Sequence, residues 1–157
     1  MIEPPLPADE TARLAALDGY GAIDPVTQNA LDSLVELAAV ICGTPTAVIS
    51  LVEGSRQRLL AKIGIAVAET PRDVSFCGHT ILADRVMVVE DARTDERFFD
   101  NPLVVGAPNI RFYAGAPLLT ISQSLVELMG DSRYGQPTWS GSSNLRALAC
   151  RHPWLAG

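Results

Sequence analysis

The stretch that decides the fold reads Glu69-Thr70-Pro71-Arg72-Asp73-Val74-Ser75-Phe76-Cys77-Gly78-His79-Thr80-Ile81-Leu82. A polar, proline-bearing approach ends at Ser75, a residue type favoured as a helix N-cap. The apolar run that follows predicts a short helix over residues 76–83. Cys77 and His79 stand two residues apart in its first turn, where both can edge a cavity although they do not share a helix face.

A second dense run, Asn109-Ile110-Arg111-Phe112-Tyr113-Ala114-Gly115-Ala116-Pro117-Leu118, follows further along the chain. We expect one strand at residues 111–119 and another at the valine-rich residues 86–90. The segment 91–109 between them reads as long and irregular. A loop of that length in a compact domain is usually functional or forms a lid.

The N-terminal part carries clear helix signals. Asp9 can cap a first helix that runs to Leu17. Asp24-Pro25 combines an N-cap residue with a proline suited to the first helical position. Apolar residues at spacings of three and four then predict a helix over residues 25–42. Gly43 closes it as a C-cap glycine.

The strands predict the fold class. Residues 46–52 are β-branched and apolar, residues 57–63 read as a second strand, and the turn Glu53-Gly54-Ser55 joins them as a hairpin. Long excursions separate the later strands, so the chain lacks the regular alternation of a parallel doubly wound sheet. We therefore predict an α+β fold in which helices pack on the faces of an antiparallel sheet.

Composition limits the function classes. The 157 residues suit one globular domain, and the net charge of −6 with a pI near 4.8 argues against binding to nucleic acid or to an anionic membrane. No apolar window is long enough to span a bilayer, and the acidic, proline-rich start is unlike a signal peptide. Three widely spaced cysteines suit a reducing cytoplasm, which is the expected location.

Ordered blocks of sequence carry a family resemblance. They are Ala12-Arg13-Leu14, Tyr20–Asp24, Ala47–Glu53, Thr70–Asp73, Ser75–His79, Val88–Ala92, Asp95–Phe98, Asp100–Val104 and Ile110–Leu118. Over residues 9–120 this set resembles a GAF domain of the kind found in bacterial histidine kinases and diguanylate cyclases. The resemblance implies a non-catalytic sensory module in signal transduction, in a two-component system or in cyclic di-GMP signalling.

The resemblance stops near residue 120. In the family an inner strand and a closing helix follow, and the helix leads to an output domain. We find neither element in the sequence of residues 121–157, where only 125–129 offers a partial replacement for the strand. Sixteen of the 18 acidic residues lie before residue 121, while serine and tryptophan become common after it. We expect an incomplete GAF-like domain over 1–120 and a divergent, partly disordered or frame-shifted tail, with no kinase or cyclase output domain in this chain.

The resemblance also suggests which residues face a small-molecule ligand. Arg97 and Arg111 flank the long loop and could clamp an anionic group. The full candidate set is Cys77, His79, Arg97, Phe98, Phe99, Asn101, Arg111 and Tyr113. The alternative is that Phe98, Phe112 and Tyr113 belong to the core and that the arginines pair with Asp91, Asp95 or Asp100.

Other functions remain as alternatives to sensing. Cys77 could serve a thiol or redox enzyme, which needs a low-pKa thiolate and an orienting third group. The domain could also be purely structural and form a homodimer through its N-terminal helices. Cys77-x-His79 and Cys150-x-His152 contain the ligand types of a zinc site but not its usual spacing. Gly78 separates Cys77 from His79, unlike the adjacent pair of bilin-attaching relatives. We expect no catalytic residue, metal or cofactor.

Overall fold

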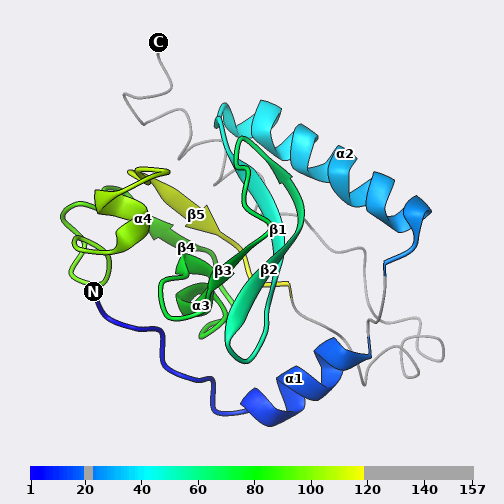
Figure 1. Cartoon of the computed structure of the whole chain (residues 1–157), viewed down its shortest axis with the longest axis horizontal. Coiled ribbons are helices and arrows are strands. Elements are labelled where there is room, and N and C mark those ends of the chain that lie inside the picture. The colour runs from blue at the N-terminus through cyan, green and yellow to red at the C-terminus, as the bar shows by residue number, and fades with distance from the viewer. Residues whose placement is uncertain (20–22, 119–157) are drawn as a thin grey trace, which may run out of the picture.

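The fold is described from a computed structural model, which defines residues 1–19 and 23–118 (Figure 1). The elements in chain order are α1 (Glu10–Asp18), α2 (Pro25–Cys42), β1 (Ala47–Val52), β2 (Arg56–Ile63), β3 (Glu69–Pro71), α3 (Phe76–Thr80), β4 (Met87–Val89), α4 (Pro102–Val105) and β5 (Tyr113–Gly115). No helix in these ranges is long and apolar enough to cross a bilayer.

Two small antiparallel sheets organise the domain. The first has the order β1-β2-β3, and the second pairs β4 with β5. Helix α2 packs along β1 and β2, whereas α3 lies on the other side, between β1 and β5 (Figure 1). Helices on the faces of antiparallel strands confirm the predicted α+β class.

Helix α2 has the predicted bounds because its two ends carry strong local signals. The Asp24 carboxylate accepts hydrogen bonds from the amides of Val26 (2.8 Å) and Thr27 (3.0 Å). Gly43 ends the helix at φ 60°, a left-handed conformation that glycine adopts without strain. The helix buries Val35 and Ala39, which secures one face of the sheet.

Several predicted bounds were wrong. Helix α3 ends at Thr80 rather than residue 83, and the strand expected over 111–119 is confined to β5. The polar stretch before Ser75 also contains β3, which pairs with β2 at the sheet edge. The segment 91–109 is not wholly irregular, because Asn101-Pro102 starts α4 with an N-cap residue followed by proline, as Asp24-Pro25 starts α2.

The predicted divergent tail, including the segment 125–129 and the expected loss of an inner strand, lies outside the described residues. So do Tyr20, Gly21 and Ala22 of the motif set. Within the described ranges, β1 pairs with β2 alone and β5 with β4 alone.

The main apolar cluster lies under α3 and joins it to β4, α4 and the segment before α4. Its buried members are Phe76, Val89, Ala92, Phe98 and Val104. The rings of Phe76 and Phe98 stack with centroids 3.9 Å apart and planes 11° apart. Close packing of these large side chains fixes the position of α3, and therefore of the polar groups that α3 carries.

Candidate functional site

A polar network lies between the two sheets, and we define it by Ser50, Gln57, Cys77, Thr80 and Tyr113. The side-chain amide nitrogen of Gln57 lies 3.0 Å from Ser50 Oγ and 3.1 Å from Cys77 Sγ. The Tyr113 hydroxyl lies 3.4 Å from the same sulfur and 2.7 Å from Thr80 Oγ1. Gln57 of β2 and Tyr113 of β5 thus both contact the Cys77 thiol, and each has a further partner, in Ser50 of β1 and Thr80 of α3.

Strand register explains the sheet side of this network. Gln57 pairs with Val52 across the hairpin, and Ser50 lies two residues before Val52 on the same strand face. Thr70 of β3 also pairs with Gln57, which extends the same face toward the sheet edge. The face therefore presents polar side chains toward α3 rather than a uniformly apolar surface.

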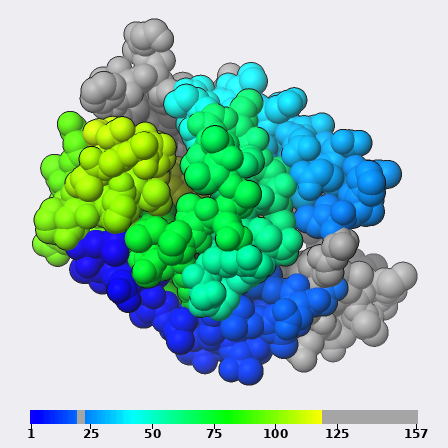
Figure 2. Space-filling model, in the orientation of Figure 1, coloured from blue at the N-terminus to red at the C-terminus, as the bar shows by residue number. Residues whose placement is uncertain are grey.

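The start of α3 positions the thiol. Ser75 Oγ accepts a hydrogen bond from the amide of Gly78 at 3.0 Å, so Cys77 lies in the first turn as predicted. Gly78 is buried tightly there, since an added Cβ would lie 2.6 Å from Pro4 Cγ. The N-terminal segment therefore covers α3, as Figure 2 shows where the blue chain start lies against the green surface.

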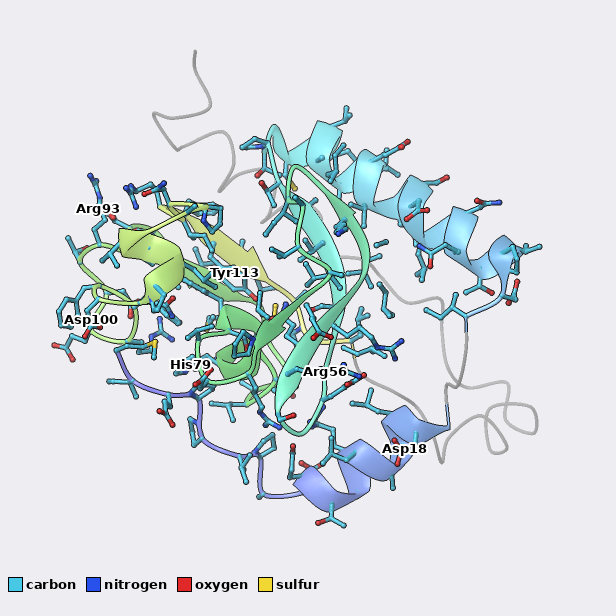
Figure 3. The ribbon with its side chains drawn as sticks, viewed as in Figure 1. Asp18, Arg56, His79, Arg93, Asp100 and Tyr113 are labelled. Atoms are coloured by element: carbon cyan, nitrogen blue, oxygen red, sulfur yellow. The ribbon has the colours of Figure 1, made fainter. Side chains whose placement is uncertain are left out.

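Burial sets the protonation states at the site. Burial is the main cause that raises the pKa of Tyr113, with smaller effects from the neighbouring Cys77 thiol, so the phenol stays protonated and can donate. Burial lowers the pKa of His79, whose Nε2 lies 3.0 Å from the Ile2 carbonyl (Figure 3). Since a carbonyl only accepts, Nε2 carries the proton. The described polar contact of His79 is thus to Ile2, not to Cys77.

The structure brings only some of the predicted site residues together. Cys77 and Tyr113 meet in the polar network. Phe98 is 1% exposed and belongs to the apolar cluster, and the His79 ring contacts it edge-on at 5.0 Å. Asn101 is also 1% exposed, where it caps α4 through the Leu103 amide and donates to the Val74 carbonyl at 2.9 Å.

The two candidate clamp arginines already have protein partners. Arg97 places Nε and Nη2 on the carboxylate of Asp95, at 2.9 and 2.7 Å. Arg111 Nη1 donates to the carbonyls of Val104 (2.8 Å) and Ile110 (3.1 Å). A clamp on an anionic ligand would have to displace these contacts. Phe99, half exposed, has no comparable packing role.

Sequence reasoning missed three residues of the network, two on the sheet and one on α3. Ser50, Gln57 and Thr80 were not candidates, although a buried glutamine in an otherwise apolar strand face is a signal for a polar site. Among the described residues, no group of three or more His, Cys, Asp or Glu side chains could hold a metal ion. Cys150 and His152, the second half of the zinc hypothesis, lie outside that range.

Comparison with known proteins gives two findings. The model of the family described as GAF domain matches residues 27–142. A cyclic di-GMP phosphodiesterase from Pseudomonas aeruginosa is 43% identical over 120 residues, which is 76% of this chain and 20% of that protein. The chain thus spans about a fifth of the length of this curated relative.

Proposed function

This chain belongs to the GAF domain family, and we propose that it is a non-catalytic sensing module that binds a small molecule. The observation that carries the proposal is the polar network, where Gln57 and Tyr113 both direct hydrogen-bonding groups at Cys77 from different sheets. A small-molecule site needs a few polar groups in fixed positions beside apolar walls. Phe76 provides such a wall, with its ring centroid 5.1 Å from that of Tyr113.

The signalling context is supported by the relative, whose name states an action on cyclic di-GMP. Because the match covers only 20% of that protein, we assign this chain a regulatory role rather than the phosphodiesterase activity. In this proposal the module works in the cytoplasm and controls a signalling output domain. A cyclic di-GMP enzyme is the output class that we favour over a two-component kinase.

A homodimer through the N-terminal helices is the second candidate function, and exposure along α2 favours it. Leu34, Leu37 and Ile41 are 54%, 54% and 57% exposed. Their spacing places them on one helix face, as in a helix–helix seam.

The thiol enzyme has weaker support. A nucleophilic cysteine needs a base in contact with it. The described side-chain contacts of Cys77 come from Gln57 and Tyr113, and neither acts as a base at neutral pH, because an amide does not titrate and the pKa of the phenol is raised.

A thermal-shift screen of nucleotides and amino acids separates these functions. Sensing predicts a saturable rise in melting temperature for one compound class. The Gln57→Leu variant should bind that compound at least tenfold more weakly. Leu37→Glu serves as the matched control, because it alters the exposed face of α2 and should leave ligand affinity unchanged. Dimerisation would be favoured if no compound gave a saturable shift and if sedimentation showed a dimer that Leu37→Glu converts to a monomer. Turnover of peroxides or sulfoxides that depends on Cys77 would favour the enzyme.

A further inference from the structure

The most buried arginine in the described chain lacks partners on one edge of its guanidinium group. Arg72 is 5% exposed, and its Nη1 pairs with the Glu10 carboxylate and donates to the Glu53 carbonyl at 3.0 Å. Its Nε and Nη2, both buried, have no hydrogen-bond partner in the structure. Buried charged donors are nearly always satisfied, so the empty edge requires an explanation.

The same edge is filled in three other arginines of the described chain, each time by one carboxylate. These pairs are Arg13 with Glu10 (2.7 and 2.9 Å), Arg93 with Asp91 (3.0 and 2.7 Å) and Arg97 with Asp95 (2.9 and 2.7 Å). The Nε and Nη2 hydrogens of a guanidinium are parallel and match two oxygens of a carboxylate or phosphate. Arg72 therefore presents an unused fork with the geometry that this chain uses repeatedly for oxyanions.

Thr70, two residues before Arg72, carries a second buried polar group without a partner, its Oγ1 hydroxyl. Thr70 and Arg72 are two residues apart along extended chain, and the Arg72 amide continues the strand pairing through the Ser55 carbonyl at 3.0 Å. Alternation places both side chains on the same face. The Thr70 hydroxyl, in β3, and the Arg72 guanidinium, directly after β3, thus leave the same side of the chain two residues apart.

Charge also favours an anion. The ion pairs around α1, the hairpin turn and β3 contain four arginines and three glutamates. They are Arg13, Arg56, Arg58, Arg72, Glu10, Glu53 and Glu69. This group has one positive charge in excess, in a chain whose net charge is −6. Figure 3 shows Arg56 of this group on the side of the hairpin that faces α1.

We propose that the Nε–Nη2 edge of Arg72, together with the Thr70 hydroxyl, is an oxyanion site beneath α1 that binds a carboxylate or phosphate group. Two oxygens of the anion accept from Nε and Nη2, and one of them also accepts from Thr70. Neither Arg72 nor Thr70 is among the residues that define the polar network, although Thr70 pairs with Gln57 across the strands. It assigns anion recognition to Arg72, whereas Arg97 and Arg111 are occupied by protein acceptors.

The test is a titration of the full chain with sodium acetate and with sodium phosphate, against sodium chloride at equal ionic strength. The probe is the Nε–Hε resonance of Arg72 in a ¹⁵N-labelled sample, which reports on the bonded edge itself. We expect a saturable shift with acetate or phosphate and none with chloride. The anion that binds with the lower dissociation constant identifies the group, carboxylate or phosphate, that the site prefers.

Two variants separate the site from general charge effects. Thr70→Val should weaken binding roughly ten- to a hundredfold, the loss expected for one hydrogen bond to a charged group. Arg93→Lys is the matched control, since the exposed Arg93 uses the same edge on Asp91, and it should leave the titration unchanged. An Arg72 resonance that does not move, or that moves equally with chloride, would overturn the proposal, as would an unchanged affinity in Thr70→Val.

Discussion

Helices α3 and α1 both lie beside the first sheet, yet different forces hold them. Helix α3 buries Phe76 in the apolar cluster, where it stacks on Phe98. Helix α1 has no buried residue. Its described tethers are polar: Arg13 Nη1 donates to the Val52 carbonyl at 2.6 Å, and Glu10 pairs with Arg72.

The difference teaches where a signal can be transmitted. Removing α3 would expose the centre of the apolar cluster, so α3 moves only when the domain unfolds. Removing α1 would break a few charged hydrogen bonds and expose little apolar surface. A ligand that binds the Arg72 guanidinium or shifts its position would therefore act on α1 first. In a sensory module, α1 is therefore the helix whose movement would most readily signal that a ligand is bound.

The largest effect should come from the packed region. Phe98→Ala removes a ring that is 1% exposed, and we expect it to lower the free energy of unfolding by about 3–5 kcal/mol. Phe99→Ala is the matched control, because the neighbouring ring is 52% exposed and its loss should cost within about 0.5 kcal/mol. Urea unfolding of both variants measures the difference. Equal costs would show that the cluster does not hold this region.

An intermediate effect should come from the tethered region. Glu10→Gln removes the carboxylate shared by Arg13 and Arg72, and we expect a loss of about 1–3 kcal/mol, the scale of a charged hydrogen bond. Asp91→Asn breaks a more exposed pair with Arg93 and should cost clearly less than Glu10→Gln, because solvent screens an exposed ion pair. If the two variants unfold at the same urea concentration, the Glu10 pairs are no more than surface contacts.

The Glu10 contribution should depend on pH in one direction. Hydrogen bonding to Arg13, followed by that to Arg72, lowers the pKa of Glu10 from 4.5 to about 2. A carboxyl group whose pKa is lower in the folded state stabilises the fold at pH values above its unfolded-state pKa. This contribution is lost as the pH falls toward its folded-state pKa. The stability gap between the natural chain and Glu10→Gln should therefore be full near pH 6 and shrink between about pH 4.5 and 2. A gap that is constant over this range would exclude the ionised carboxylate as its cause.

The smallest effect should come from the polar network. Tyr113→Phe removes the hydroxyl that contacts Thr80 and Cys77 while keeping the ring on Phe76, so we expect a loss of about 0.5–1.5 kcal/mol. The Cys77 thiol should also react faster with iodoacetamide, since it loses a close neighbour. If Tyr113→Phe lowers the free energy of unfolding as much as Phe98→Ala does, Tyr113 belongs with the core residues. A core role was the alternative to a ligand-facing role for this residue.

Local signals account for what the sequence predicted well. The bounds of α2 follow from Asp24-Pro25 and Gly43, which act within a few residues of each helix end. The N-cap at Ser75 is equally local. Helix α4 was missed although Asn101-Pro102 carries the same kind of signal, because the surrounding turns lack a helical repeat.

Long-range contacts account for what could not be predicted. Arg72 meets Glu10 across 62 residues, and Tyr113 meets Cys77 across 36. No periodicity in the sequence marks such pairs. The Arg97–Asp95 pair shows the contrast, because these residues are two apart and the sequence did offer Asp95 as a partner for an arginine of this loop.

Native-state hydrogen exchange tests most directly the division into a packed region and a tethered region. We expect the α3 amide of Thr80 and the Phe98 amide, which donates to the Asp95 carbonyl at 2.9 Å, to exchange only through global unfolding. The α1 amides of Leu14 to Asp18 should exchange through local opening, at a lower free energy that hardly changes with low concentrations of urea. Exchange of α1 at the same free energy as Phe98 would contradict the account, because it would show that α1 unfolds only with the core.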